Sequence, residues 1–131
     1  MRIYLDTSAL VKLVVAEDES QSLRSFLIAR GEDTFFSAAL ARTELIRAVA
    51  PNGAQAVADA RNLLRSLDTV TLTRQLLDDA GTLVPLRLRS LDAIHLVAAQ
   101  RAGDTLRVVI TYDARMISAA ADLGIPTAAP R

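Results

Sequence analysis

Apolar positions along the chain recur with two different spacings, one typical of strands and one typical of helices. Arg2–Leu5 is a short apolar-rich run that ends in Asp6-Thr7-Ser8, and apolar residues then recur at helical spacing up to Val14. We interpret this beginning as a strand, a turn and a helix. The pattern then predicts helices over 20–30, 38–50, after 53 through 67, 73–84, 91–102 and 114–123, and strands over Thr34–Phe36, Val70–Leu72, Val108–Thr111 and Ile125–Ala128.

Capping residues and helix breakers mark where these helices begin and end. Ser20, Thr73 and Ser90 stand where an N-cap is expected, because each precedes a run at helical spacing. Pro85 breaks the helical pattern before it, and Gly124 is expected just past the end of the last helix. The helices are therefore separate elements joined by short turns.

The order of these elements predicts an α/β fold. Strands separated by ten or more helical residues need crossover connections, so the sheet should be mainly parallel, with helices on both faces. The length of 131 residues and the 51% share of hydrophobic residues suit one compact domain. We expect residues 1–131 to form a single three-layer α/β/α sandwich around a mainly parallel central sheet, with functional groups at the carboxyl ends of its strands.

The composition excludes several kinds of site and partner. The chain has no cysteine, which excludes disulfides, thiolate zinc sites and thiol nucleophiles. Its fifteen basic and fifteen acidic residues balance, so any contact with nucleic acid must be local. No apolar run approaches the roughly 20 residues of a membrane span, and Met1-Arg2 leads directly into a strand rather than a signal peptide. We expect a soluble, cytoplasmic protein with no membrane partner.

Two acidic residues follow apolar strands. Asp6 comes after Arg2–Leu5, and Asp113 comes after Val108–Thr111. The carboxyl ends of parallel strands meet at one edge of a sheet, so both carboxylates are expected there. Each also has a structural explanation, because an aspartate in this position can cap the helix that follows it.

Two further acids, Glu44 and Asp92, stand inside helices among leucine, isoleucine and alanine neighbours. A buried carboxylate without a partner is costly, so such an acid usually pairs with arginine, caps a helix or binds a cation. Asp92 has a structural alternative, because Ser90 as N-cap would place it in the first helical turn, where the helix dipole favours negative charge. Four separate structural roles are a weaker explanation than one cation site that uses all four acids.

A cluster of Asp6, Glu44, Asp92 and Asp113 suits Mg²⁺ chemistry on a phosphodiester. Mg²⁺ takes hard oxygen ligands, keeps several waters and is commonly held by one or two carboxylates together with substrate phosphate. The residues alone predict metal-dependent phosphoryl chemistry and leave open whether one or two ions take part. His95, the only histidine, lies three residues after Asp92. A ligand or general-base role is open to it, but a packed side chain with a backbone or carboxylate partner is the commoner arrangement.

Three stretches of the sequence carry motifs that are specific in combination. They are Tyr4-Leu5-Asp6-Thr7-Ser8-Ala9-Leu10, Ser90-Leu91-Asp92-Ala93-Ile94-His95-Leu96 and Thr111-Tyr112-Asp113. In this order and spacing they resemble the PIN-domain ribonucleases, and specifically VapC-type toxins. Glu44, in Arg42-Thr43-Glu44-Leu45, is similar to the family's helical glutamate, whereas residues 51–89 match only in their helical character.

The resemblance implies a Mg²⁺-dependent endoribonuclease, the toxin of a type II toxin-antitoxin system, which cleaves RNA through a metal-activated water. The four acids would surround Mg²⁺, or Mn²⁺ as a substitute, with Asp6 and Asp92 as direct ligands and Ser8 and Thr111 as supporting hydroxyls. The implied partners are RNA and a VapB-type antitoxin, and apolar helices suggest a homodimer. Five arginines near the motifs could hold phosphates or pair with nearby acids: Arg42, Arg47, Arg87, Arg89 and Arg115.

Two other classes of function stay open on the residues alone. A phosphatase or receiver-type α/β domain also carries aspartates at strand ends and uses one of them as nucleophile or phosphoacceptor. Asp6-Thr7-Ser8, however, lacks the second acid that such sites place close after the first. A non-enzymatic binding module would instead use the acids to dock a basic peptide.

Overall fold

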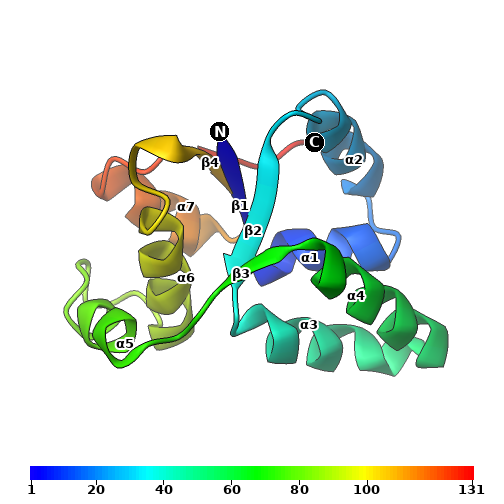
Figure 1. Ribbon diagram of the computed structural model, residues 1–131, viewed down its shortest axis with the longest axis horizontal. Helices are drawn as coiled ribbons and strands as arrows, with labels where there is room; N and C mark the ends of the chain where they lie inside the picture. The colour runs from blue at the N-terminus through cyan, green and yellow to red at the C-terminus, as the bar shows by residue number, and fades with distance from the viewer.

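The chain folds into a parallel β-sheet between two layers of helices (Figure 1). The computed structural model describes residues 1–131, and its five strands follow the order β3-β2-β1-β4-β5 with every neighbouring pair parallel. The predicted α/β fold is confirmed, and the sheet is parallel throughout. The strands are β1 (Arg2–Leu5), β2 (Thr34–Ala38), β3 (Asp68–Val70), β4 (Leu106–Ile110) and β5 (Thr127–Ala128), and the helices are α1 (Thr7–Val14), α2 (Ser20–Ile28), α3 (Ala41–Val49), α4 (Ala54–Ser66), α5 (Arg74–Gly81), α6 (Ser90–Gln100) and α7 (Ala114–Asp122).

The central strand β1 is buried on both faces, in two apolar cores. Tyr4 lies on the face covered by α5, α6 and α7, where it packs with Phe36 and Val109. Ile3 and Leu5 lie on the opposite face, which α1 to α4 cover. Side chains alternate along a strand, so a strand that is buried on both faces has a continuous run of apolar residues in its sequence.

None of the helices is both long and apolar enough to cross a membrane.

Two predicted helix caps are wrong. Ser20 and Ser90 are the first residues of α2 and α6, not the residues before them. The Ser20 hydroxyl accepts from the Glu17 amide at 2.9 Å and so closes the preceding turn instead of capping α2. The Arg89 carbonyl accepts from the Ala93 amide at 2.9 Å, so α6 begins one residue earlier than expected and has no side-chain cap.

The pairing of β2 with β3 shifts the predicted boundaries in the first half of the chain. Ala38 belongs to β2 because it pairs with Val70, and α3 therefore begins only at Ala41. β3 begins and ends two residues earlier than predicted. The cap predicted for α5 is confirmed, because the Thr73 hydroxyl accepts from the Leu76 amide at 3.1 Å.

The register between β1 and β4 brings the ends of these strands to one edge of the sheet. Leu5 pairs with Ile110, and the Asp6 amide donates to the Ile110 carbonyl at 3.2 Å. Asp6 and Thr111, which follow these paired residues, are therefore neighbours across the two strands. Asp113 comes two residues after Thr111, so the edge predicted from the parallel order carries both acids.

Candidate active site

Asp6 is a buried carboxylate that caps α1. The residue is 3% exposed. Its Oδ1 accepts from the Ser8 hydroxyl at 2.6 Å and from the Ala9 amide at 3.0 Å, and its Oδ2 accepts from the Thr111 hydroxyl at 2.5 Å. Burial raises the pKa of Asp6 above its ordinary value, although these hydrogen bonds favour the charged form. A carboxylate has about four lone-pair sites, so Asp6 keeps about one for a ligand.

The hydroxyls of Ser8 and Thr111 connect Asp6 to the loop that follows β4. Ser8 donates to Asp6 and accepts from the Tyr112 amide at 3.0 Å. Thr111 donates to Asp6 and accepts from the Asp113 amide at 3.2 Å. Each hydroxyl therefore accepts from a backbone amide and donates its proton to the carboxylate. Both residues thus contact the acid they were predicted to support.

Asp113 is the N-cap of α7. Its Oδ1 accepts from the amides of Arg115 and Met116 at 2.8 and 3.2 Å. The capping role considered for this acid is therefore confirmed. Both hydrogen bonds fall on Oδ1, so the cap leaves Oδ2 open to a further contact.

Asp92 lies in the first turn of α6, as predicted, and faces other negative charges. The pKa of Asp92 is raised first by burial and then by the carboxylates of Asp113 and Asp6. His95 and Arg89 act in the opposite direction, but no hydrogen bond to Asp92 offsets the increase. Asp113 and Asp6 therefore both disfavour the charged form of Asp92.

Glu44, on α3, has donors around it instead of acids. Its Oε1 accepts from the Thr7 hydroxyl at 2.7 Å and from Nε2–H of His95 at 2.6 Å. Burial raises the pKa of Glu44, but these two hydrogen bonds outweigh burial, and the pKa lies below its ordinary value. Thr7 is the neighbour of Asp6 in the chain, so this contact ties Glu44 to the beginning of α1.

His95 is buried, and both of its ring nitrogens have partners. It is 2% exposed, and its Nδ1 lies 2.5 Å from the Tyr4 hydroxyl, which also accepts from the Ala38 amide at 3.2 Å. Burial raises the pKa of Tyr4, so this hydroxyl keeps its proton. The structure shows the packed histidine with a carboxylate partner that the sequence favoured. Tyr4 and Thr7 were not predicted as contacts of this network, although the tyrosine within a strand of aliphatic residues was an available signal.

The structure brings three of the four predicted acids into one electrostatic group and links Glu44 to it through Thr7. No three acidic or histidine side chains lie close enough together to hold a metal ion by themselves. The residues nevertheless fit Mg²⁺, which is commonly held by one or two carboxylates and completes its shell with water and phosphate. Asp92 has both carboxylate oxygens available, and a cation would relieve the repulsion between Asp92 and its acidic neighbours.

The chain matches a known protein family. The model of the PIN domain family matches residues 3–122, which is most of the chain. The protein belongs to the PIN domain family.

Curated relatives within this family are similar over nearly their whole length. Ribonuclease VapC46 of Mycobacterium tuberculosis (strain ATCC 25618 / H37Rv) is 48% identical over 98% of this chain and 97% of its own. Ribonuclease VapC47 of M. tuberculosis (strain CDC 1551 / Oshkosh) is 45% identical, and ribonuclease VapC35 of the H37Rv strain is 42% identical, each over 98% of this chain and 96% of its own. The resemblance carried by the three motifs therefore extends through the middle of the sequence.

Proposed function

We propose that this protein is a VapC-type ribonuclease toxin that cleaves RNA phosphodiester bonds at the acidic edge of its sheet. The observation that carries the proposal is that Asp6 and Asp113 follow the paired ends of β1 and β4, and that the pKa of Asp92 is raised by burial and then by both of these carboxylates. Membership of the PIN domain family and similarity to proteins named ribonucleases support RNA as the substrate.

The proposed cofactor is Mg²⁺, with Mn²⁺ as a substitute. Asp6 and Asp92 are the proposed direct ligands, and Asp113 and Glu44 complete the acidic surroundings of the ion. When bound, such an ion polarises the scissile phosphate and makes a water a stronger nucleophile at neutral pH. The donor set supports this choice of metal, because it consists of carboxylate oxygens and contains no thiolate.

The role of the chain is to hold these acids in fixed orientations. Ser8 and Thr111 donate to Asp6 and favour its charged form even though it is buried. His95 donates to Glu44 and keeps that carboxylate ionised. Asp92 has no comparable donor, so it is the carboxylate that gains most from a cation.

A cleavage assay tests this function. We expect the purified protein to cleave single-stranded or looped RNA with Mg²⁺ or Mn²⁺ and to stop in EDTA, because the carboxylates supply no nucleophile by themselves. Asp92→Asn should cleave far more slowly, whereas Asp122→Asn, which removes an exposed acid of α7, should cleave like the wild type. Activity that persists in EDTA would exclude the metal mechanism. A protein that cleaves no RNA but accepts phosphate from a phosphodonor on an aspartate would support the receiver-type alternative.

The proposed protein partners are a VapB-type antitoxin and a second copy of the chain. The family resemblance supports the antitoxin. Leu77, Val84, Leu86 and Leu91 are exposed on α5, α6 and the loop between them, and such neighbouring apolar side chains support self-association. Light scattering is expected to give the mass of a dimer for the protein alone. A monomer at every concentration tested would exclude the homodimer.

A further inference from the structure

A cavity beside the acidic edge is lined by two arginines. It has a volume of about 430 Å³ and lies between the loop that precedes α6 and the first turns of α7. Arg87 and Leu88 line it from the loop, and Ala114, Arg115 and Ser118 line it from α7. This volume falls within the roughly 300–1,000 Å³ typical of pockets for small ligands. We call it the Arg87–Arg115 cavity.

Both walls of the cavity continue directly into the acidic site. The loop wall leads into α6, which carries Asp92 in its first turn, and the other wall begins at Ala114, next to Asp113. The Arg87–Arg115 cavity therefore adjoins the place where the scissile phosphate of a substrate would lie.

The two arginines of this cavity are free for a ligand. Arg2, Arg101, Arg107 and Arg131 form ion pairs with acids of the chain, whereas no such pair involves Arg87 or Arg115. A guanidinium group binds a phosphate through two parallel hydrogen bonds. The other walls include the side chains of Leu88, Ala114 and Ala119, which offer an apolar surface to a flat ring.

We propose that the Arg87–Arg115 cavity binds the RNA nucleotide next to the cleaved bond, with its phosphate on the two arginines and its base against the apolar wall. The inference rests on the proposed ribonuclease function and names a substrate subsite for it. An acidic peptide would also suit the charge of the cavity. RNA is favoured because a strand that places one phosphate at Asp92 and Asp113 brings a neighbouring nucleotide within reach of the adjoining cavity.

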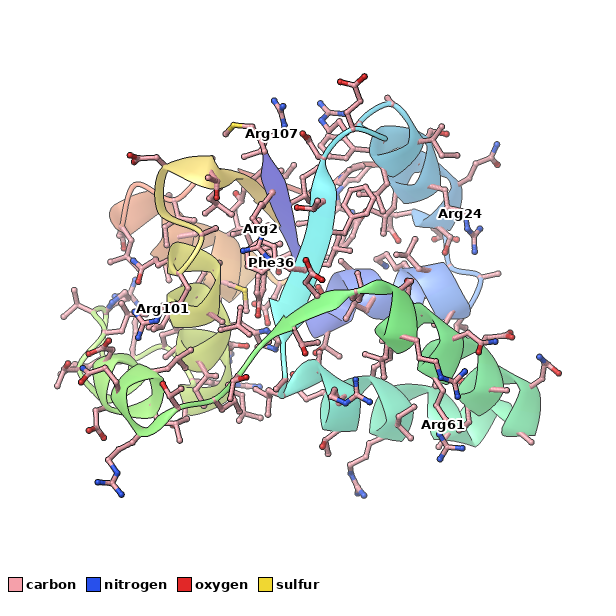
Figure 2. The ribbon with its side chains drawn as sticks, in the orientation of Figure 1. Arg2, Arg24, Phe36, Arg61, Arg101 and Arg107 are labelled. Carbon is pink, nitrogen blue, oxygen red and sulfur yellow. The ribbon has the colours of Figure 1, made fainter.

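Three alanine variants test the arginines. Arg87→Ala and Arg115→Ala remove one charge each from the cavity, and Arg24→Ala removes one exposed charge from α2, in the helical layer across the sheet (Figure 2). Binding of a labelled single-stranded RNA is measured by fluorescence anisotropy with Ca²⁺ in place of Mg²⁺, at several salt concentrations. The slope of log affinity against log salt is about 0.7 per phosphate contact on single strands. We expect each cavity variant to bind about tenfold more weakly and to lower the slope by about 0.7, with Arg24→Ala unchanged.

A fourth variant tests the cavity space without changing charge. Ser118 is exposed and lines the cavity, so Ser118→Phe should fold normally and fill it. We expect this variant to raise the KM for RNA cleavage in Mg²⁺ while the melting temperature stays that of the wild type. Arg115→Lys should recover only part of the lost affinity, because an ammonium group lacks the paired donors of guanidinium.

The outcomes separate the subsite from the proposed function. If the wild type cleaves RNA, but both arginine variants match Arg24→Ala in affinity and salt slope, the cavity is not an RNA subsite. The same conclusion holds if these variants lose only binding of the antitoxin, which would assign the cavity to a protein partner. If the wild type cleaves no RNA with any metal, the proposed function itself fails.

Discussion

Replacing Asp92 by asparagine distinguishes a cation site from a structural acid, because the two hypotheses predict opposite changes in stability. The pKa of Asp92 is raised by burial and by Asp113 and Asp6. A carboxyl group whose pKa is raised in the folded state contributes stability at low pH, and this contribution is lost as the pH rises through the raised pKa. At neutral pH the ionised Asp92 therefore destabilises the metal-free protein. Asp92→Asn should be as stable as the wild type or more stable in EDTA, and the difference should shrink as the pH falls.

Bound Mg²⁺ reverses this comparison. At about 100 times its Kd, an ion that binds only the folded state adds about 2.7 kcal/mol to the free energy of unfolding. The unfolding entropy of about 2.1 cal/mol/K per residue amounts to about 0.28 kcal/mol/K for the 131 residues of this chain. The melting temperature of the wild type should then rise by about 10 °C. The rise should be smaller for Asp92→Asn, together with its rate of RNA cleavage.

Thermal melts in EDTA and in millimolar Mg²⁺ measure both effects. The wild type and Asp92→Asn are compared with Asp122→Asn, in which an exposed acid of α7 is replaced. If Asp92 were a structural acid, asparagine would lower the free energy of unfolding by roughly 1 kcal/mol, or about 4 °C, in both buffers. That result, with cleavage intact, would refute the cation site at Asp92.

Three further substitutions test neighbouring groups. Asp6→Asn should be harmless in cells at expression levels at which the wild type arrests growth, because loss of a ligand misplaces the ion. Equal toxicity would show that Asp6 is not part of the site. Thr111→Val removes a hydroxyl that donates to Asp6, and we expect RNA cleavage to fall by about 10–100-fold; an unchanged rate would mean that this contact does not orient Asp6. Tyr4→Phe leaves the Ala38 amide and Nδ1 of His95 without their buried partner. The free energy of unfolding, measured by urea denaturation, should fall by about 1–3 kcal/mol. A smaller decrease would show that water replaces the hydroxyl.

The positions of Asp6 and Asp113 could be predicted from the sequence because they depend on local pattern. Each follows a short apolar strand, and the parallel order of the sheet then places both at the same edge. The caps expected at Ser20 and Ser90 were wrong because a serine beside a helix can serve either the helix or the turn before it. Whether the serine caps the helix or closes the preceding turn depends on the path of the chain outside the helix.

Contacts between distant residues could not be predicted in this way. His95 meets Tyr4 across 91 positions and Glu44 across 51 positions, and only the packing of α6 against the sheet brings them together. The shared position of two arginines could not be predicted from the sequence either. Five arginines lie near the motifs, but Arg87 and Arg115 share a cavity only because the loop before α6 packs beside α7.

The four acids form two electrostatic groups, and Glu44 should respond to substitution in the opposite sense to Asp92. Its pKa is lowered by hydrogen bonds from His95 and Thr7 that outweigh burial, so its ionised form stabilises the fold above its ordinary pKa, and this contribution is lost as the pH falls through the lowered value. Glu44→Gln weakens both hydrogen bonds and should lower the free energy of unfolding in EDTA by about 1 kcal/mol at neutral pH. Melts in EDTA would thus place Glu44→Gln below the wild type and Asp92→Asn at or above it. A stabilised Glu44→Gln would contradict this division, because it would put Glu44 among the carboxylates that repel one another without an ion.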